Sequence, residues 1–358
     1  MLAHQKTGWI GFDLGATSVK VAQVVRTDAG PRIRSAAIVP RAERWAPGAL
    51  TDDRPRSSAD EIRCSASLCD RLHGANAASI LPVTVCDVVQ MEAPAAKRGG
   101  AVDLLRAMEA ETHRTMRDRV VDSWPVSLQP GKINVVAAPR AWSEQISADV
   151  AAAGWNCRVI DALPWALARA ASLNSGVDAG TPVAALDWGY GKSTITLVHN
   201  GVPVHVRSLK DCAFQTILET ISRGLRLDEG DAELLLQKHG LTTASGGIRS
   251  AELAASPAPG SSVIDDLLEQ PLNRLTLELR RTLDFWRGIT RGKLPEAIFI
   301  FGGGGTLAGI GDRLTEQLGI RVGPWQLPAE EPADAAQLPP ACLLGAAIGL
   351  SAVAWEAP

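Results

Sequence analysis

GWIGFDLGATSVKVAQVV at residues 8–25 and VAALDWGYGKSTITLV at residues 183–198 follow one plan. Each stretch has an apolar run, then Asp-x-Gly, then small or hydroxyl residues, then a run of β-branched residues. The two aspartates are Asp13 and Asp187. A glycine next to an aspartate permits a tight turn with exposed backbone N–H groups, and such a turn suits a phosphate.

Strands rather than helices are expected after both turns, because SVKVAQVV and STITLV are rich in β-branched residues. In a dinucleotide-binding G-x-G-x-x-G segment the glycines open a helix instead. A second turn then leads to a third strand in each copy, at residues 28–31 and at 199–201. A strand–turn–strand–turn–strand unit that occurs twice predicts two similar halves, each offering one phosphate turn to a shared cleft.

Composition narrows the function classes. A chain of 358 residues with 46% hydrophobic and 21% charged residues is typical of a globular protein with two domains or lobes. The net charge of −3 argues against general nucleic-acid binding, which needs a basic surface. The six cysteines form no C-x-x-C pair, and the six histidines form no H-x-x-x-H pair, so we expect reduced thiols and no zinc site.

Neither end of the chain predicts a membrane anchor. The N-terminus lacks a cationic segment followed by a long apolar one, so we expect no signal peptide. The uncharged stretch 338–355 contains prolines and small residues, which favours a helix packed within the protein over a membrane span. We therefore expect a cytoplasmic protein.

Periodicity and turn signals place the remaining elements. Helices are expected at 61–74, 101–116, 142–154, 164–174, 212–224, 228–239, 263–288, 307–319 and in the last stretch. The helix at 263–288 should bend or restart at Pro271. Strands are expected within 78–93, at 119–128, 132–139, 157–162 and 297–301. Residues 41–60 are polar and contain prolines, so we expect a loop there. Residues 242–262 are rich in Gly, Ser, Ala and Pro and predict a mobile excursion.

The first turn carries candidate phosphate ligands. Its backbone N–H groups and hydroxyls can hold phosphates while a lysine adds a point charge. These candidates are Asp13, Gly15, Ala16, Thr17, Ser18 and Lys20. The plainer interpretation is an ordinary hairpin turn.

The second turn carries a candidate metal ligand. Mg²⁺ is usually held by one or two carboxylates together with the phosphates, so Asp187, with Asp13, is the candidate. The further phosphate candidates here are Gly189, Gly191, Ser193 and Thr194. We expect Lys192 to face solvent.

Four glycines lie between an apolar strand and a helix. They are Gly302, Gly303, Gly304 and Gly305. Such a run is expected where a ligand must approach the backbone closely, and the following helix N-terminus suits polar ligand groups. A flexible connection is the alternative.

Taken together, these segments resemble the actin-like ATPase superfamily, an α/β fold with two similar lobes around a nucleotide cleft. Within it the chain resembles the PilM family of type IV pilus assembly proteins, relatives of the cell-division protein FtsA. GFDLGATSVKVAQV, VVAAPRAWSEQISADVAAAGWNCRVIDALPWALARA, LDWGYGKSTITLVHNGVPVHVRSL, LTLELRRTLDFW, IFIFGGGGTLAGI and PPACLLGAAIGLS carry the resemblance in order.

The resemblance implies a domain organisation and a role. It implies a first lobe at 1–77, an FtsA-like inserted small subdomain at 78–162, a connection at 163–181, a second lobe at 182–340 and a closing helix at 341–358. It implies ATP and Mg²⁺ as ligands, with Glu233 and the four glycines near the adenosine. The implied partner is the cytoplasmic N-terminal tail of a PilN-like membrane protein, within an inner-membrane complex for pilus assembly or related secretion.

Departures from the family pattern bear on catalysis. Asp211-Cys212 replaces a Gly-Gly pair, and Leu236 replaces a lysine near the adenosine, so we expect weak or no ATP hydrolysis. A sugar-type kinase is the alternative, although no Asn-x-x-Asp segment supplies its base and Asp161 precedes a predicted helix. A membrane-attached filament former would want a cationic amphipathic C-terminal helix, which is not seen.

Overall fold

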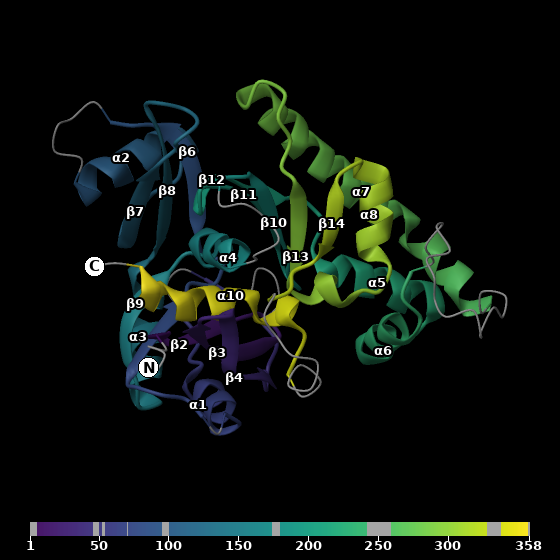
Figure 1. Ribbon diagram of the computed structural model, residues 1–358, viewed down its shortest axis with the longest axis horizontal. Helices are drawn as coiled ribbons and strands as arrows, with labels where there is room; N and C mark the ends of the chain where they lie inside the picture. Colours follow the sequence, from purple (N-terminus) through teal and green to yellow (C-terminus); the bar gives the residue numbers. More distant parts are fainter. Residues whose placement is uncertain are drawn as a thin grey trace.

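Two sheets of matching topology and a smaller third sheet make up the structure (Figure 1). The computed structural model describes residues 6–45, 50–51, 54–69, 71–94, 100–173, 180–241, 259–327 and 338–356.

The first sheet contains the first Asp-x-Gly turn. Its strands are β1 Lys6–Thr7, β2 Ile10–Leu14, β3 Ser18–Thr27, β4 Gly30–Pro40, β5 Asn76–Ile80 and β9 Asn156–Asp161. The hairpin partners β2, β3 and β4 pair antiparallel, whereas β2, β5 and β9 run parallel. Gly11 and Phe12 of β2 face Ala22 and Val21 of β3 in this register.

The second sheet repeats this order. Its strands are β10 Val183–Trp188, β11 Ser193–His199, β12 Val202–Leu209, β13 Ala297–Phe301 and β14 Arg321–Pro324. Again three strands pair antiparallel and the first of them runs parallel to two later strands. The predicted duplication of a three-strand unit is confirmed, and each lobe extends it with two parallel strands. We call the part built on each sheet the first and the second lobe.

Two buried helices separate the sheets. Helix α10 (Ala341–Ala352) packs on β2 and β3, α4 (Leu163–Ser172) packs on β10, β11 and β12, and the two helices pack on each other (Figure 1). Small residues permit this contact: a Cβ on Gly349 would lie 1.9 Å from the Ala166 carbonyl oxygen. The apolar C-terminal stretch is thus an internal helix, as predicted.

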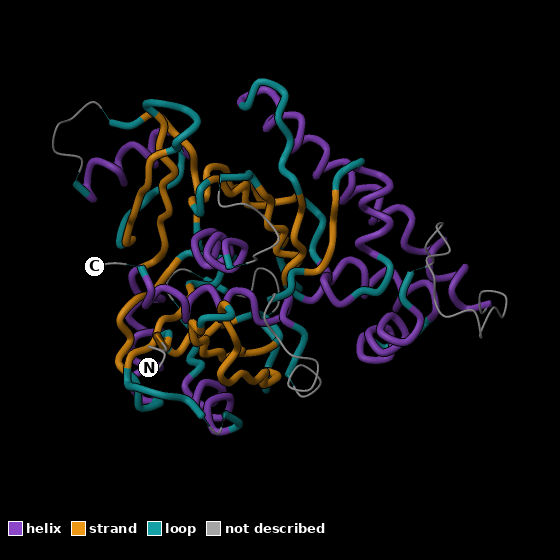
Figure 2. The backbone as a smooth tube through the Cα atoms, in the orientation of Figure 1, coloured by secondary structure: helices purple, strands orange, loops and turns teal. Residues whose placement is uncertain are grey.

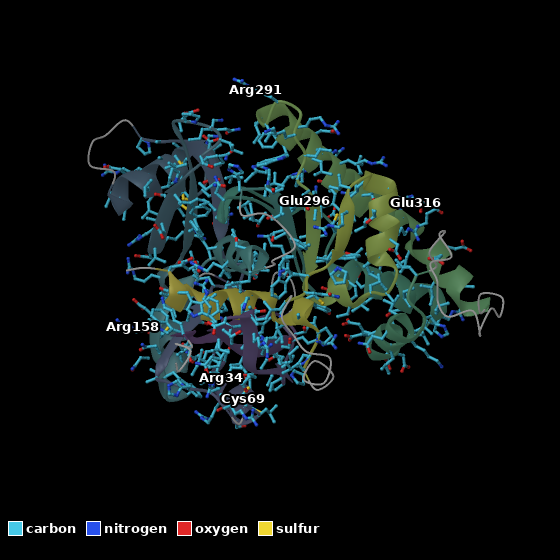
Figure 3. All side chains as sticks on the ribbon, in the orientation of Figure 1. Arg34, Cys69, Arg158, Arg291, Glu296 and Glu316 are labelled. Atoms are coloured by element: carbon cyan, nitrogen blue, oxygen red, sulfur yellow. The ribbon has the colours of Figure 1, made fainter. Side chains whose placement is uncertain are left out.

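The remaining helices cover the outer faces. Helices α1 (Ala59–Ser67) and α3 (Arg140–Ala152) pack against the first sheet. The second lobe carries α5 Phe214–Leu225, α6 Glu229–His239, α7 Pro259–Ile289 and α8 Ile310–Leu318. Short 3₁₀ turns occupy Gly303–Thr306 (η1) and Val353–Trp355 (η2). In Figure 3, Arg34 and Cys69 lie at the first lobe and Glu316 at the second.

The long helix does not restart at Pro271, one of the two outcomes expected there, because α7 runs continuously through that residue. The first turn of a helix can accept proline, but Pro271 lies in the helix interior. Buried leucines before and after it, Leu268, Leu272 and Leu275, anchor both halves of α7 in the core of the second lobe. Packing therefore holds the helix together at this point.

The third sheet is inserted between β5 and α3. It contains β6 Asp87–Glu92, β7 Arg119–Pro125 and β8 Lys132–Pro139, backed by α2 Ala101–Thr112. These elements span 87–139 of the 78–162 range expected for an inserted subdomain, while β5 and β9 pair in the first sheet. Figure 2 shows the insertion apart from the outer helices of the second lobe.

Side chains attach this insertion to the edge of the second sheet. The Trp124 indole donates to the Pro203 carbonyl oxygen at 2.6 Å, and the Asn134 amide donates to the same oxygen at 3.2 Å. The Gln90 amide donates to the Val204 carbonyl oxygen at 3.2 Å. Both carbonyl oxygens belong to β12, an edge strand of the second sheet. The insertion is continuous in sequence with the first lobe, so these bonds connect it to the second lobe as well.

In the described part of the chain, no helix has the length and apolar character needed to cross a membrane. Most of the excursion expected at 242–262 lies outside the described residues, and α7 begins within it, at Pro259.

Candidate functional site

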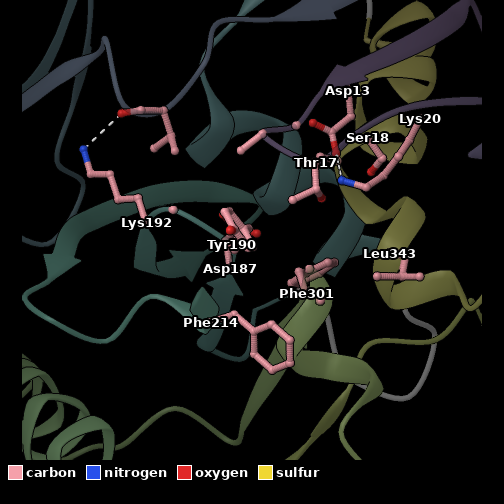
Figure 4. A pocket seen from close by; sticks show the side chains of 18 of the residues that line it. Asp13, Thr17, Ser18, Lys20, Asp187, Tyr190, Lys192, Phe214, Phe301 and Leu343 are labelled. Carbon is pink, nitrogen blue, oxygen red and sulfur yellow. Dashed lines mark hydrogen bonds and ion pairs between the residues drawn. The ribbon is translucent and has the colours of Figure 1, made fainter. Parts of the chain in front are cut away.

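A cleft of about 640 Å³ opens between the lobes, and both Asp-x-Gly turns line it (Figure 4). Asp13 lies near the carboxyl end of β2, and Asp187 lies near the carboxyl end of β10. The residues after the parallel neighbours β5 and β13 join them, including Pro82 and Gly302. Ligands of open α/β sheets bind at this end of the strands.

The first aspartate is neutralised within its own hairpin. Asp13 and Lys20 are cross-strand partners, and their side chains form an ion pair at 2.7 Å. Both side chains are largely buried and both line the cleft. Lys20 therefore brings a positive charge to the cleft wall at the position where phosphates were expected (Figure 4).

The residue opposite the second aspartate in its hairpin carries no charge. Thr194 occupies the register position opposite Asp187 that Lys20 occupies opposite Asp13. Burial and the nearby Asp13 carboxylate raise the pKa of Asp187 to about 7, although Lys20 opposes the shift. A carboxyl group of this kind is poised to gain a cation, which fits the expected Mg²⁺ ligand.

Both turns need their glycine for the same reason. A Cβ on Gly15 would lie 2.9 Å from the Ser18 carbonyl oxygen, and a Cβ on Gly189 would lie 2.8 Å from the Lys192 carbonyl oxygen. In each turn the third residue after the glycine folds back over it. Gly302 has φ of +77°, and a Cβ there would lie 3.0 Å from Asp187 Oδ1.

Most of the predicted ligands line the cleft. Those that do are Asp13, Gly15, Ala16, Thr17, Ser18, Lys20, Asp187, Gly189, Gly191, Glu233, Gly302 and Gly303. Ser193 and Thr194 do not: they are buried in β11, and the Ser193 hydroxyl donates to the Cys212 carbonyl oxygen at 2.9 Å.

The last two glycines of the run also lie outside the cleft lining. A Cβ on Gly304 would meet the Trp188 ring at 2.2 Å, and one on Gly305 would lie 3.1 Å from Cys342 Cβ. These two glycines permit close packing instead. We leave all four residues, Ser193, Thr194, Gly304 and Gly305, out of the site described below.

An apolar wall forms the second-lobe side of the cleft. Phe214, Leu218, Leu236 and Leu307 line it and are buried, with Gly303 beside Phe214. Leu236, the departure from the family pattern, is thus part of an apolar surface that suits the face of a nucleobase. Glu233 lies at the rim of this wall, with its side chain 42% exposed.

Lys192 faces the cleft wall, contrary to the expectation that it faces solvent. Its ammonium donates to the Val83 carbonyl oxygen of the first lobe at 3.0 Å, and burial lowers its pKa (Figure 4). Val83 lies 109 residues away in the sequence, so no local sequence pattern could indicate this contact.

A second group missed by sequence reasoning lies at the mouth of the cleft. Arg44 of the first lobe forms an ion pair with Glu229 of α6, and its guanidinium lies 5.6 Å from the centre of the Tyr190 ring. The Tyr190 hydroxyl donates to Glu229 at 3.1 Å. The segment that carries Arg44 was predicted only as a polar loop, which gave no signal for these contacts.

Comparison with known proteins adds the fold family. No protein-family model matches the chain, and no curated protein sequence matches it. A solved structure described as the PilM-PilN type IV pilus biogenesis complex is 22% identical, with a TM-score of 0.74, covering 98% of this chain and 99% of that chain.

Two further solved structures are similar at lower levels. The ethanolamine utilization protein EutJ from Carboxydothermus hydrogenoformans is 15% identical, with a TM-score of 0.53, covering 96% of this chain and 90% of that one. A ROK family glucokinase from Streptomyces griseus, in complex with glucose and AMPPNP, is 12% identical, with a TM-score of 0.52, covering 98% of this chain and all (100%) of that one. The chain therefore has the actin-like ATPase fold, as predicted.

Proposed function

We propose that this protein is a PilM-like scaffold of an inner-membrane assembly complex for type IV pili or related secretion. One observation carries the proposal: the likeness to a chain of the structure described as the PilM-PilN type IV pilus biogenesis complex extends over 98% of this chain and 99% of that one. The sequence motifs point to the same family independently, because they occur in the family's order along the chain.

ATP and Mg²⁺ are the ligands we propose for the cleft. The two turns would hold the phosphates through their backbone N–H groups and Lys20. Asp187, with Asp13 beyond it, would hold Mg²⁺, whose charge offsets the two carboxylates and the phosphates. The apolar wall around Leu236 would take the base. The AMPPNP in the similar glucokinase supports this assignment of the cleft.

We infer weak or no hydrolysis. Among the described residues that line the cleft, the carboxylates are Asp13, Asp187 and Glu233. Asp13 is bound to Lys20, Asp187 is assigned to the metal, and Glu233 lies 3.9 Å from Arg44 at the rim. This arrangement leaves the proposed site without a carboxylate free to orient an attacking water.

A sugar-type kinase is less well supported. Such an enzyme needs a carboxylate base next to the acceptor hydroxyl. Asp161, the candidate from the sequence, forms an ion pair with Arg169 and accepts a hydrogen bond from its neighbour Ala162 at 2.7 Å. It is not among the residues that line the cleft, and the match to the glucokinase is weaker than the match to the PilM-PilN complex.

The partner we propose is the cytoplasmic N-terminal tail of a PilN-like membrane protein, docking near the insertion formed by residues 87–139. The protein would then lie at the inner membrane through this partner. A pull-down with the N-terminal peptide of a single-span protein encoded beside this chain tests the proposal. We expect capture by that peptide and none by a scrambled peptide of the same composition; equal capture by both would refute the proposal.

The ligand assignment is tested separately. Mg-ATP should raise the melting temperature of the protein, and Asp187→Ala should abolish the part of this rise that depends on Mg²⁺. An unchanged rise in the variant would remove Asp187 from the metal site while leaving the scaffold proposal standing.

A further inference from the structure

Residues 41–45 contact both the first phosphate turn and the second lobe. They follow β4 directly, and Arg44 and Trp45 line the cleft. The sequence gives them no motif, and their contacts are not explained by the proposed ligand binding alone.

Arg41 and Trp45, the first and last residues of this segment, bind three consecutive carbonyl groups of the phosphate turn. The Arg41 side-chain Nε donates to the Gly15 carbonyl oxygen at 2.7 Å, and the Trp45 backbone N–H donates to the Ala16 oxygen at 2.8 Å. The Arg41 backbone N–H donates to the Thr17 oxygen at 2.9 Å. These three hydrogen bonds connect the carbonyl side of the turn to residues 41–45.

Arg41 and Trp45 form a rigid unit. The Arg41 guanidinium lies 3.4 Å from the centre of the Trp45 ring, and both residues are buried. Arg41 also donates to the Ser58 hydroxyl at 3.0 Å, and Trp45 packs edge-on against Trp142 with ring centres 5.6 Å apart. A cation stacked and hydrogen-bonded in this way has little freedom to move independently of the turn.

From within the same segment, the Arg44 side chain reaches the second lobe. It pairs with Glu229, lies 3.9 Å from Glu233 and lies over Tyr190, which itself belongs to the second phosphate turn. The Arg44 side chain is 45% exposed. Exposed ion pairs are weak, so this contact can open and close without unfolding either lobe.

We propose that residues 41–45 are a strap that couples the conformation of the first phosphate turn to closure of the cleft. Arg41 and Trp45 are its positioning residues, and Arg44 is its contact with the second lobe. When Arg44 holds Glu229, the turn is fixed for a phosphate. A phosphate in the turn favours the closed contact by the same factor, because coupling between two sites is reciprocal.

The first experiment tests the strap without any nucleotide. Hydrogen exchange of the Arg41 and Trp45 backbone amides, which donate to the turn, is compared between wild type, Arg44→Ala and the control Arg63→Ala, an exposed arginine of α1. The Arg44 side chain takes no part in these two hydrogen bonds, yet we expect roughly fivefold faster exchange in Arg44→Ala, from the usual strength of such a pair, and no change in the control. Equal exchange in all three proteins would overturn the proposal.

The second experiment rests on the proposed nucleotide binding. The release rate of a fluorescent ATP analogue with Mg²⁺ is measured for Arg44→Ala, Arg41→Lys and the double variant. Each single change should speed release several-fold. If Arg41 and Arg44 act through one strap, the double variant should release the analogue no faster than the quicker of the two single variants. If they act independently, the increases in release rate of the two single variants should multiply in the double variant.

The outcomes separate the two ideas. No binding of the analogue by wild type would refute the nucleotide site but leave the exchange result to decide the strap. Binding with unchanged release in Arg44→Ala would refute the strap alone. If Arg41→Lys fails to fold, Glu229→Gln replaces it, because this change removes the partner of Arg44 on the second lobe. Glu229→Gln should match Arg44→Ala in both measurements. A Glu229→Gln variant that matches wild type would contradict the proposal.

Discussion

Asp187 should make the ligand-free protein lose stability as the pH rises. Its pKa is about 7 in the folded state against 3.8 for the free side chain, so the folded protein binds more protons than the unfolded chain between these values. The free energy of unfolding therefore falls across this window, by roughly 4 kcal/mol at most. Asp187→Asn, which stays neutral, should be more stable than wild type at pH 8, and this margin should shrink as the pH falls and vanish below about pH 4.

Denaturant unfolding with EDTA present measures this effect. The exposed Asp60→Asn on α1 is the control, and its pH profile should follow wild type. Parallel profiles for Asp187→Asn and wild type would show that Asp187 ionises normally. Mg-ATP should remove the difference between the two at pH 8, because the metal would then neutralise the carboxylate.

Alanine substitutions at two neighbouring glycines should differ strongly in their effect on the free energy of unfolding. Gly304→Ala would place a methyl group 2.2 Å from the buried Trp188 ring and should lower the free energy of unfolding by about 2 kcal/mol or more. At Gly303 the nearest atom to a new Cβ is 3.6 Å away, on Phe214, so Gly303→Ala should cost little. Thermal melts of both variants decide the matter; equal losses would contradict this account of the run.

At this scale the sequence predicted backbone turns better than side-chain roles. Asp-x-Gly fixed both turns because sterics act within four residues, as Gly15 and Gly189 show. Ser193 and Thr194 were assigned to phosphate because they follow the turn. Strand β11 already begins at Ser193, and the Ser193 hydroxyl donates to the buried Cys212 carbonyl oxygen. Lys192 could not be placed, since its acceptor belongs to the other lobe.

Among the elements, the close crossing of α4 and α10 requires a residue without a side chain at position 349. Gly349→Ala would place a methyl group 1.9 Å from the Ala166 carbonyl oxygen, and neither buried helix can move away cheaply. We expect a loss of about 3 kcal/mol or complete failure to fold. The matched control is Gly288→Ala on the exposed face of α7, where nothing lies within 4 Å.

The control should leave stability unchanged or slightly raised, because alanine has the higher helix propensity but Gly288 lies in the last turn of α7. Denaturant titration compares both variants with wild type. If Gly349→Ala were tolerated as well as Gly288→Ala, the close contact between the two central helices would not contribute to stability as we argue.

Elements with strong periodicity were predicted well, and those fixed by distant contacts were not. The helices α5 and α6 begin within two residues of their expected starts. Strand β14 was not expected, because its four residues carry no alternation and form a strand only beside β13. The segment 41–45 was classed as loop, yet it contacts both lobes.

For the whole molecule, repetition was the informative signal. Two copies of one motif predicted two lobes and a shared cleft, and the two sheets do have the same strand order. The limits of the insertion were harder to predict. The expected range of 78–162 includes β9 and part of β5, although these strands pair with each other in the first sheet. Strand pairing across 80 residues is a tertiary contact that local pattern does not encode.

The insertion should be separable from nucleotide binding. Its first and last strands are adjacent at the base, where Asp87 of β6 pairs with Ala137 of β8. Partners in an antiparallel ladder lie about 5 Å apart, so a short Gly-Ser linker can replace residues 87–139 without moving β5 or α3. Removal also breaks the hydrogen bonds to Pro203 and Val204, which should lower the melting temperature by a few degrees.

We expect this shortened protein to keep its Mg-ATP-dependent thermal stabilisation and to lose capture by the PilN-like tail peptide. Circular dichroism establishes first that it is folded. The control is full-length Trp124→Phe, which removes only the indole donor to Pro203 and should retain the peptide. Undiminished capture by the folded, shortened protein would place the partner's site elsewhere. Loss of both activities would mean instead that the insertion supports the cleft through its contact with β12, whose neighbour β11 extends directly from the second phosphate turn.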